Sequence, residues 1–250
     1  MQWGFPIAMM KTVFWPNRYN YLVWGNALFL LTLLLFNKAD PISIVFAYFL
    51  ETIVIGLFHV VKLWMVNTYG KQGPNNHQMP KSSVGLVLFF LFHYGMFVGI
   101  QSVFVFAFFQ SKLPQIKEPF HILDNYAAVI QLEGMPVLIA SLFVSNLKYF
   151  YSNFLHNAQY KEYTPGALFF KPYVRILIQQ FVVILSGFFF ILFSEGFAAA
   201  ILLIVFRLVV DLVMVAIRAD NTNMDVVLKK ITHGEKEFEA AKKNLQEYTE

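Results

Sequence analysis

The chain has 250 residues, of which 58% are hydrophobic and only 14% are charged. A soluble domain carries about 45–50% apolar and about 25% charged residues, so this composition indicates an integral membrane protein. There is no Cys, which excludes disulfides, thiol catalysis and Cys-ligated zinc or iron–sulfur centres. The net charge of +4 does not indicate nucleic-acid binding, because Lys and Arg lie mostly at the ends of apolar segments and in the C-terminal tail.

Six apolar segments follow one another along the chain, each near the length of about 20 residues that a membrane-spanning helix needs. They are expected at about 20–36, 42–66, 84–109, 125–147, 173–193 and 197–217. The fourth is the least regular, because the stretch "QLEGMPV" interrupts it. None of the segments alternates in polarity as the strands of a β-barrel would. The sequence therefore predicts an all-α polytopic membrane protein, a bundle of six transmembrane helices.

The two ends of the chain differ from this transmembrane domain, which is expected over 19–218. Residues 1–18 lack the basic start, long apolar core and cleavage site of a signal peptide, so a cytoplasmic or interfacial leader is expected. Residues 219–250 form a charged amphipathic tail in which Ile231, Phe238 and Leu245 recur every seven residues. This repeat predicts a short cytoplasmic C-terminal helix that lies on the membrane face or contacts a second copy of the chain.

Lys and Arg are unevenly distributed between the loops on the two sides of the predicted bundle. The richer side includes both termini and the loops after the second and fourth segments. Because positively charged loops stay in the cytoplasm, the N-terminus and the C-terminus are both predicted to lie inside.

Polar side chains interrupt five of the six segments. A charge at the centre of a membrane helix costs about 2.5–3.5 kcal/mol, so Glu51 is expected to face the bundle interior and to find a partner there. The partner expected for Glu51 is His93 on the next segment, and Arg207 and Asp211, four residues apart, are expected to form an ion pair. The predicted polar interior comprises Glu51, His93, Gln101, Glu133, Gln180, Arg207 and Asp211.

Three further polar residues lie nearer the ends of their segments. His59, Asn146 and Arg175 are expected at the membrane interface, where they would be solvated or would extend towards water.

Three stretches resemble, in the same order, a family of uncharacterised prokaryotic multi-pass membrane proteins, a domain of unknown function. They are "YFLETIVIGLFHVVKLW", "FFLFHYGMFVGIQSVFVFAFF" and "SNLKYFYSNFLHNAQYKEYTPGALFFKPYVRILIQQ". The resemblance covers roughly residues 20–218 and includes Glu51, His93-Tyr94-Gly95, Asn153-Phe154, Glu162-Tyr163, the Pro172–Ile176 run and Asp211-Leu212. It implies a multi-pass protein of the prokaryotic cytoplasmic (inner) membrane.

The resemblance also bears on metal binding. Similar sequences place further histidines where this chain has Gln101, Asn146, Gln180 and Val215. A family with that many intramembrane histidines would suit a metal or haem, since imidazole and carboxylate are common ligands. This chain would keep His93, Glu51 and Asp211 as ligands, but amides or an apolar group stand at the other positions, so no cofactor is expected.

The sequence leaves three kinds of function open. The favoured one is a non-enzymatic structural or accessory subunit with a hydrogen-bonded polar interior. The alternatives are an intramembrane metal- or haem-dependent enzyme or redox protein, and a small proton-coupled transporter in which Glu51 is protonated. Walker loops, G-x-G-x-x-G and H-E-x-x-H are absent. The expected partners are the lipid bilayer and a protein or second copy bound through a membrane face or the C-terminal helix, with no nucleic acid.

Overall fold

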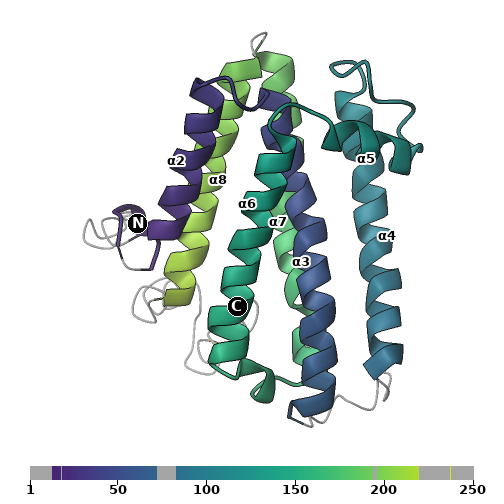
Figure 1. Cartoon of the computed structure of the whole chain (residues 1–250), viewed down its shortest axis with the longest axis vertical. Helices are drawn as coiled ribbons and strands as arrows, with labels where there is room; N and C mark the ends of the chain where they lie inside the picture. Colours follow the sequence, from purple (N-terminus) through teal and green to yellow (C-terminus); the bar gives the residue numbers. More distant parts are fainter. Residues whose placement is uncertain (1–12, 18, 72–82, 194–195, 220–236, 238–250) are drawn as a thin grey trace. The chain divides into compact units, whose positions relative to one another are not determined.

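A computed structural model of the chain describes residues 13–17, 19–71, 83–193 and 196–219, together with Glu237 (Figure 1). Regular structure over these residues is helical throughout, without a strand. The elements are α2 (Tyr21–Leu35), α3 (Pro41–Tyr69), α4 (Ser83–Phe109), α5 (Ile122–Ile130), α6 (Met135–Tyr149), η2 (Phe150–His156), η3 (Gln159–Lys161), α7 (Pro165–Leu192) and α8 (Gly196–Ala219). Most of the predicted leader and C-terminal tail falls outside the described residues.

The helical fold confirms the predicted class, and the number of spans is four or five by length and composition. The helices α3, α4, α7 and α8 are each long and apolar enough to cross a membrane. The fourth predicted span is divided into α5 and α6, which meet at 97° and would count as one further, bent span. Helix α2 has 15 residues, about 22 Å at 1.5 Å per residue, which is less than the roughly 30 Å of a hydrocarbon core.

One predicted boundary differs clearly from the structure. The fifth predicted span was expected from residue 173, but α7 begins at Pro165. Thr164 caps this end, because its side chain accepts a hydrogen bond from the Ala167 N–H at 3.3 Å. Pro165 occupies the first turn, where its missing N–H costs nothing. The helix therefore begins two turns before the predicted boundary, at a capped Thr-Pro start.

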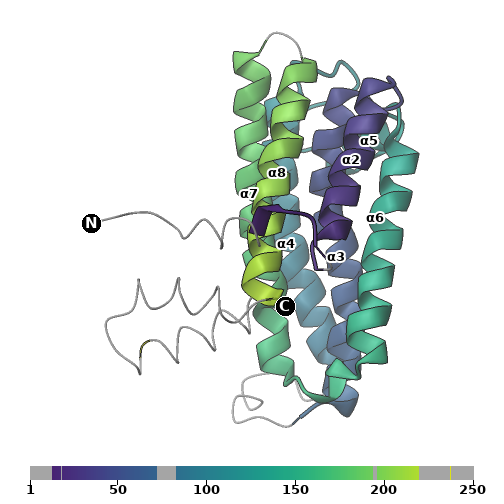
Figure 2. The same ribbon diagram turned by 90° about the vertical axis from the view of Figure 1, so that its left-hand side faces the viewer.

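The chain divides into two compact units, Phe36–Ala200 and Met1–Leu35 with Ile201–Glu250. Helix α3 is central in the first, where it contacts α4, α6 and α7 (Figures 1 and 2). Residues 43–52 of α3 are all buried, as expected for a helix that is apolar on every side. The helix starts sharply because the Asp40 carboxylate accepts a hydrogen bond from the Ile42 N–H at 2.7 Å.

The C-terminal end of α3 is joined to the segment that precedes α7. The Lys71 N–H donates to the Tyr163 carbonyl at 3.0 Å, and the Lys71 side chain forms an ion pair with Glu162. A Cβ on Gly70 would lie 2.6 Å from the Tyr163 carbonyl oxygen, so the two backbones meet where only glycine fits. The segment that contains Glu162 and Tyr163 is therefore held against the end of α3.

Helix α6 continues into an unusual segment. Residues Phe150–His156 form η2, a π-helix of seven residues. Phe150 and Phe154 are both buried there, and their rings stack with centroids 5.6 Å apart. Phe150 also packs against Phe58 of α3 at 5.6 Å, so this wider helix brings aromatic rings onto α3.

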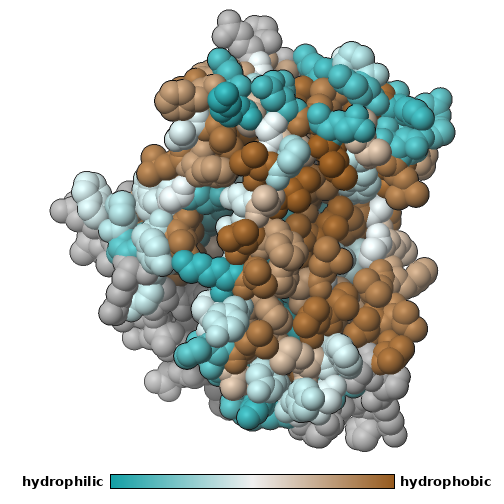
Figure 3. Space-filling model, viewed as in Figure 1, coloured by the Kyte–Doolittle hydropathy of each residue, from teal (hydrophilic) through white to brown (hydrophobic). Residues whose placement is uncertain are grey.

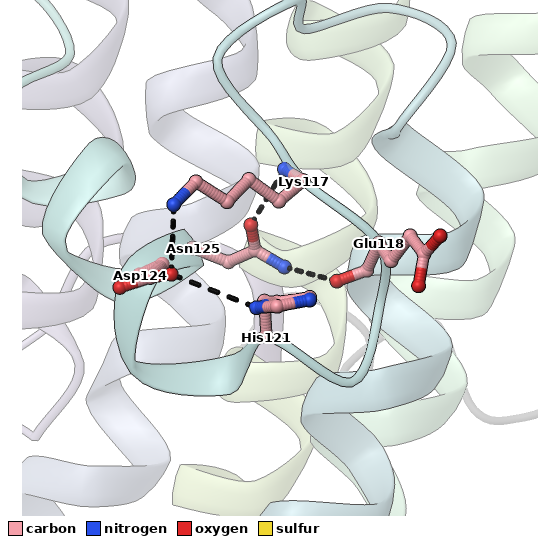
Figure 4. A network of polar contacts seen from close by, with 5 residues as sticks. All are labelled: Lys117, Glu118, His121, Asp124 and Asn125. Carbon is pink, nitrogen blue, oxygen red and sulfur yellow. Dashed lines mark hydrogen bonds and ion pairs between the residues drawn. The ribbon is translucent and has the colours of Figure 1, made fainter.

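The loop between α4 and α5 is organised by Asn125, which is fully buried (Figure 4). Its side-chain oxygen accepts from the Lys117 N–H at 2.7 Å, and its amide donates to the Glu118 carbonyl at 3.0 Å. The Lys117 ammonium lies 2.8 Å from Asp124, and His121 lies 3.6 Å from the same carboxylate. This polar cap closes one end of the unit.

We expect Asp124 to titrate below its ordinary pKa of 3.8, because the Lys117 ammonium donates a hydrogen bond to the carboxylate and attracts its charge. Since the folded pKa is the lower one, the stabilisation is present above the unfolded pKa and is lost as pH falls through the folded pKa. Carboxyl NMR titration of the wild type and of Lys117→Met measures this. An Asp124 pKa that is the same in both would contradict the assignment.

The outer face of α4 is apolar. Large side chains such as Leu88, Phe92 and Phe104 are exposed along it. Figure 3 shows hydrophobic residues across the middle of one face and hydrophilic residues over the loop between α4 and α5. This distribution is typical of a protein whose flank contacts lipid and whose ends contact water.

Candidate functional site

A buried hydrogen-bonded network joins α3 to α7 around Glu51. Glu51 is 6% exposed, and its Oε2 accepts a hydrogen bond from the Gln179 amide at 3.2 Å. The oxygen of the same amide accepts from the Thr52 hydroxyl at 2.8 Å. One glutamine side chain therefore connects two adjacent residues of α3, using both its donor and its acceptor.

Tyr94 extends this network to α4. Its hydroxyl donates to the Thr52 carbonyl at 2.6 Å, and the side chain is 5% exposed. The ring fits against Gly56, where an added Cβ would lie 2.5 Å from a ring carbon. Because Tyr94 needs this glycine, the small residue explains how α4 approaches α3 so closely. Glu51, Thr52, Tyr94 and Gln179 together form what we call the interior network.

His93 lies in a different setting, on the side of α4 that faces α7. Its Nδ1 is 2.5 Å from the Tyr173 hydroxyl, and the imidazole is half-buried. The rings of Phe89, Phe97 and Phe169 surround it with centroids 5.4–6.1 Å away. The side chains that bond to Glu51 and His93 are thus Gln179 and Tyr173, neither of which the sequence singled out as a site residue.

The other residues predicted for the polar interior differ in burial and in hydrogen bonding. Gln101 is buried in α4, at 8% exposure. Gln180 is half-buried, and its Oε1 is a buried atom with no hydrogen-bond partner. Glu133 is exposed in the turn between α5 and α6, where its carbonyl accepts from the Asp40 N–H at 3.3 Å. Because α5 and α6 are separated here, Glu133 lies in neither helix and does not face the bundle interior.

The predicted pair of Arg207 and Asp211 is confirmed within α8. Arg207 Nε lies 3.1 Å from Asp211 Oδ2, as expected for residues one turn apart. Arg207 is 5% exposed.

The residues predicted for the membrane interface lie in different environments. His59 is buried at 5% exposure, so its placement at a solvated interface was wrong. Its ring packs on Phe90 with centroids 5.0 Å apart, which keeps it inside. Asn146 is half-buried near the end of α6 and donates to the Leu142 carbonyl at 2.9 Å. The side chain of Arg175 lies outside the described part of the structure.

No three His, Asp or Glu side chains gather as a metal site anywhere in the described part of the chain. The ligand set suggested for a metal, Glu51, His93 and Asp211, does not form such a group there. Glu51 and His93 instead hold their own hydrogen-bond partners, Gln179 and Tyr173. The geometry thus favours hydrogen bonding over coordination for these two side chains.

Charge is unequal at the two ends of the Phe36–Ala200 unit. Around the C-terminal part of α3 and the start of α7, the described charged residues are Lys62, Lys71, Lys148, Lys161, Lys171 and Glu162. Around the opposite end they are Lys38, Lys112, Lys117, Asp40, Glu118, Asp124 and Glu133. One end is therefore strongly basic, and the other is nearly balanced.

Comparison with known proteins gives one result. Residues 9–227 match a family described as "Family of unknown function (DUF6498)". No protein of curated function matches the chain. No solved structure matches it either.

Proposed function

Since this chain belongs to the DUF6498 family of unknown function, we propose its role from the arrangement of its polar side chains. We propose a non-enzymatic integral membrane protein, a structural or accessory subunit whose polar interior holds α3, α4 and α7 together. The observation that supports this role is the Gln179 amide, which bonds to both Glu51 and Thr52 between buried helix faces. In an apolar bundle, such bonds fix which helix faces meet.

The network suits a structural role better than a catalytic one. Its members bond to one another, with Tyr94 donating to Thr52 and Gln179 donating to Glu51. A catalytic constellation would instead aim a donor or a base at a place where a substrate fits. The interior network consists of buried helix side chains, and their hydrogen bonds go to other residues of the chain.

The basic end of the Phe36–Ala200 unit supports an orientation. Positively charged segments stay on the cytoplasmic side, so this end would lie inside and the α4–α5 loop outside. If α2 and the bent α5–α6 pair are counted as spans, the chain crosses the membrane six times and both termini lie in the cytoplasm. The family resemblance supports the prokaryotic inner membrane as the location. The exposed apolar face of α4 is the proposed contact for lipid or a second copy.

The structural role makes a direct prediction for Glu51→Gln. The variant keeps an oxygen that accepts from the Gln179 amide, so we expect the free energy of unfolding to stay within about 1 kcal/mol of the wild type. Elemental analysis of both purified proteins should find no metal in a one-to-one ratio. A stoichiometric metal that is lost in Glu51→Gln would contradict the role and favour the metal-dependent alternative.

A further inference from the structure

A hydrogen-bonded pair of polar side chains lies among aromatic rings between α4 and α7. His93 Nδ1 is 2.5 Å from the Tyr173 hydroxyl. The rings of Phe89, Phe97 and Phe169 lie 5.4–6.1 Å from the imidazole, measured between centroids. We name these five residues the aromatic site. None of its members carries a charge while the imidazole is neutral, so the site suits an uncharged ligand.

The second ring nitrogen of His93 is available to a ligand. A phenol is a stronger acid than a neutral imidazole, so the Tyr173 O–H donates to Nδ1 and the ring proton is on Nε2. Nε2 makes no hydrogen bond to any residue that the structure describes, and it is not enclosed as Gln180 Oε1 is, so a bound molecule can reach it. An N–H without an acceptor is unfavourable in hydrocarbon, which supplies none. A ligand with an acceptor oxygen would satisfy it.

The surrounding rings favour a flat ligand. The Phe89 ring is nearly parallel to the rings of His93 and Phe169, at interplanar angles of 21° and 18°. Phe169 is 1% exposed and forms the inner wall of the site, whereas Phe89 and Phe97 are 45% and 37% exposed. A flat conjugated ring can stack on such exposed aromatic faces, and a flexible acyl chain gains less from them.

The depth of the site requires a ligand that dissolves in the bilayer. Helix α4 begins at Ser83, so His93 is about 15 Å from that end at 1.5 Å per residue. The 27 residues of α4 extend about 40 Å, or about 5 Å beyond each edge of a centred hydrocarbon core of roughly 30 Å. His93 would thus lie about 10 Å inside the hydrocarbon, below the layer of the lipid headgroups.

We infer that the aromatic site binds the head ring of an isoprenoid quinone. One quinone carbonyl accepts a hydrogen bond from His93 Nε2, the ring stacks against Phe89 and Phe97, and the isoprenoid tail extends into the lipid. Phospholipid ester carbonyls are also acceptors, but they lie at the edge of the hydrocarbon rather than at this depth. The bond between His93 and Tyr173 is separate from the hydrogen bonds of the interior network, so this site goes beyond the structural role proposed above and does not depend on it.

The test uses the full chain purified in detergent and titrated with a short-chain menaquinone, with bound ligand counted by native mass spectrometry. The comparison ligand is the matching prenylated naphthalene, which has the same ring system but no carbonyl. The quinone should bind at least about tenfold more tightly, as expected for one hydrogen bond. Equal affinity for the two ligands would overturn the proposal. Displacement of the quinone by phosphatidylcholine at the same concentration would show that a lipid ester occupies the site, and would overturn the quinone as ligand.

Variants assign the site to its residues. His93→Phe should weaken quinone binding about tenfold and abolish the difference between the two ligands. In the wild type the infrared C=O stretch of the bound quinone should lie at lower frequency than in detergent alone, because a hydrogen bond weakens the C=O bond, and His93→Phe should remove this shift.

Tyr173→Phe removes the hydroxyl that orients the imidazole and should weaken quinone binding about threefold. The control Tyr126→Phe also removes a hydroxyl that hydrogen-bonds to α4, at Ser102, and should leave the affinity unchanged. Equal losses in Tyr126→Phe and Tyr173→Phe would show a general effect of loosening α4 and overturn the site. If a variant does not fold, the wild-type comparison of the two ligands and the infrared shift decide.

Discussion

Gln179→Leu is expected to lower the free energy of unfolding by about 2 kcal/mol, the largest effect of any single polar substitution in the interior network. The substitution removes the donor to Glu51 and the acceptor of Thr52 in one step. Leucine fills a similar volume, so the loss arises from the hydrogen bonds rather than from a cavity. Thermal or denaturant unfolding of the purified protein in detergent measures the change.

The neighbouring residue supplies the matched control. Gln180 stands one position along α7, and its Oε1 has no hydrogen-bond partner. Gln180→Leu should therefore change stability by less than about 0.5 kcal/mol, or increase it, since a buried polar atom without a partner is itself unfavourable. If the two substitutions cost the same, the network does not stabilise the helix contacts and the structural role fails.

Gly134→Ala is expected to destabilise the protein by about 3 kcal/mol or more, or to prevent folding. Gly134 has φ of 79°, a left-handed conformation that residues with a Cβ rarely adopt. Its added Cβ would also lie 2.4 Å from the Lys38 carbonyl oxygen, and a backbone atom cannot move aside as a flexible side chain can. The yield of folded protein and its melting temperature report the effect.

The control for this prediction is Gly99→Ala on α4. An added Cβ there meets nothing within 4 Å. Alanine is favoured over glycine in a helix by about 1 kcal/mol, so stability should stay equal or rise. A loss in Gly99→Ala as large as in Gly134→Ala would show that glycine-to-alanine changes are harmful here for reasons other than the turn at Gly134.

Hydropathy predicted the helices well because the membrane requires long apolar segments with every backbone group bonded inside the helix. The four longest helices were all expected. The sequence placed an interruption at "QLEGMPV", but hydropathy could not predict the 97° bend between α5 and α6, because a bend depends on how Gly134 meets the segment before α3. It also missed the start of α7, which the Thr164 cap and Pro165 set eight residues before the expected boundary at residue 173.

Partners of polar residues were harder to predict than the helices. Glu51 was identified from its cost in an apolar segment, yet its bonded partner proved to be Gln179. The sequence contains two adjacent glutamines, and only the packing of α7 decides which one faces α3. Gln179 continues the stripe of buried residues that includes Ile176 and Val182, whereas Gln180 lies beside it.

His59 was misplaced for a related reason. Its distance from the end of the predicted span suggested an interface, but burial in a bundle depends on the neighbouring helix as well as on depth. The His59 ring packs on Phe90 of α4, so a neighbouring helix covers this part of α3.

Which residues of the π-helix η2 face α3 depends on the number of residues in this segment, and not only on their identity. Each residue of an α-helix turns the next by about 100°, so deleting one residue from Phe150–His156 would turn everything beyond it by that angle. Phe154, whose ring lies beside the Lys62 ammonium, would then leave its place. In family members, a one-residue gap in this segment would mark a different lining around the lysine, even where the flanking residues are identical.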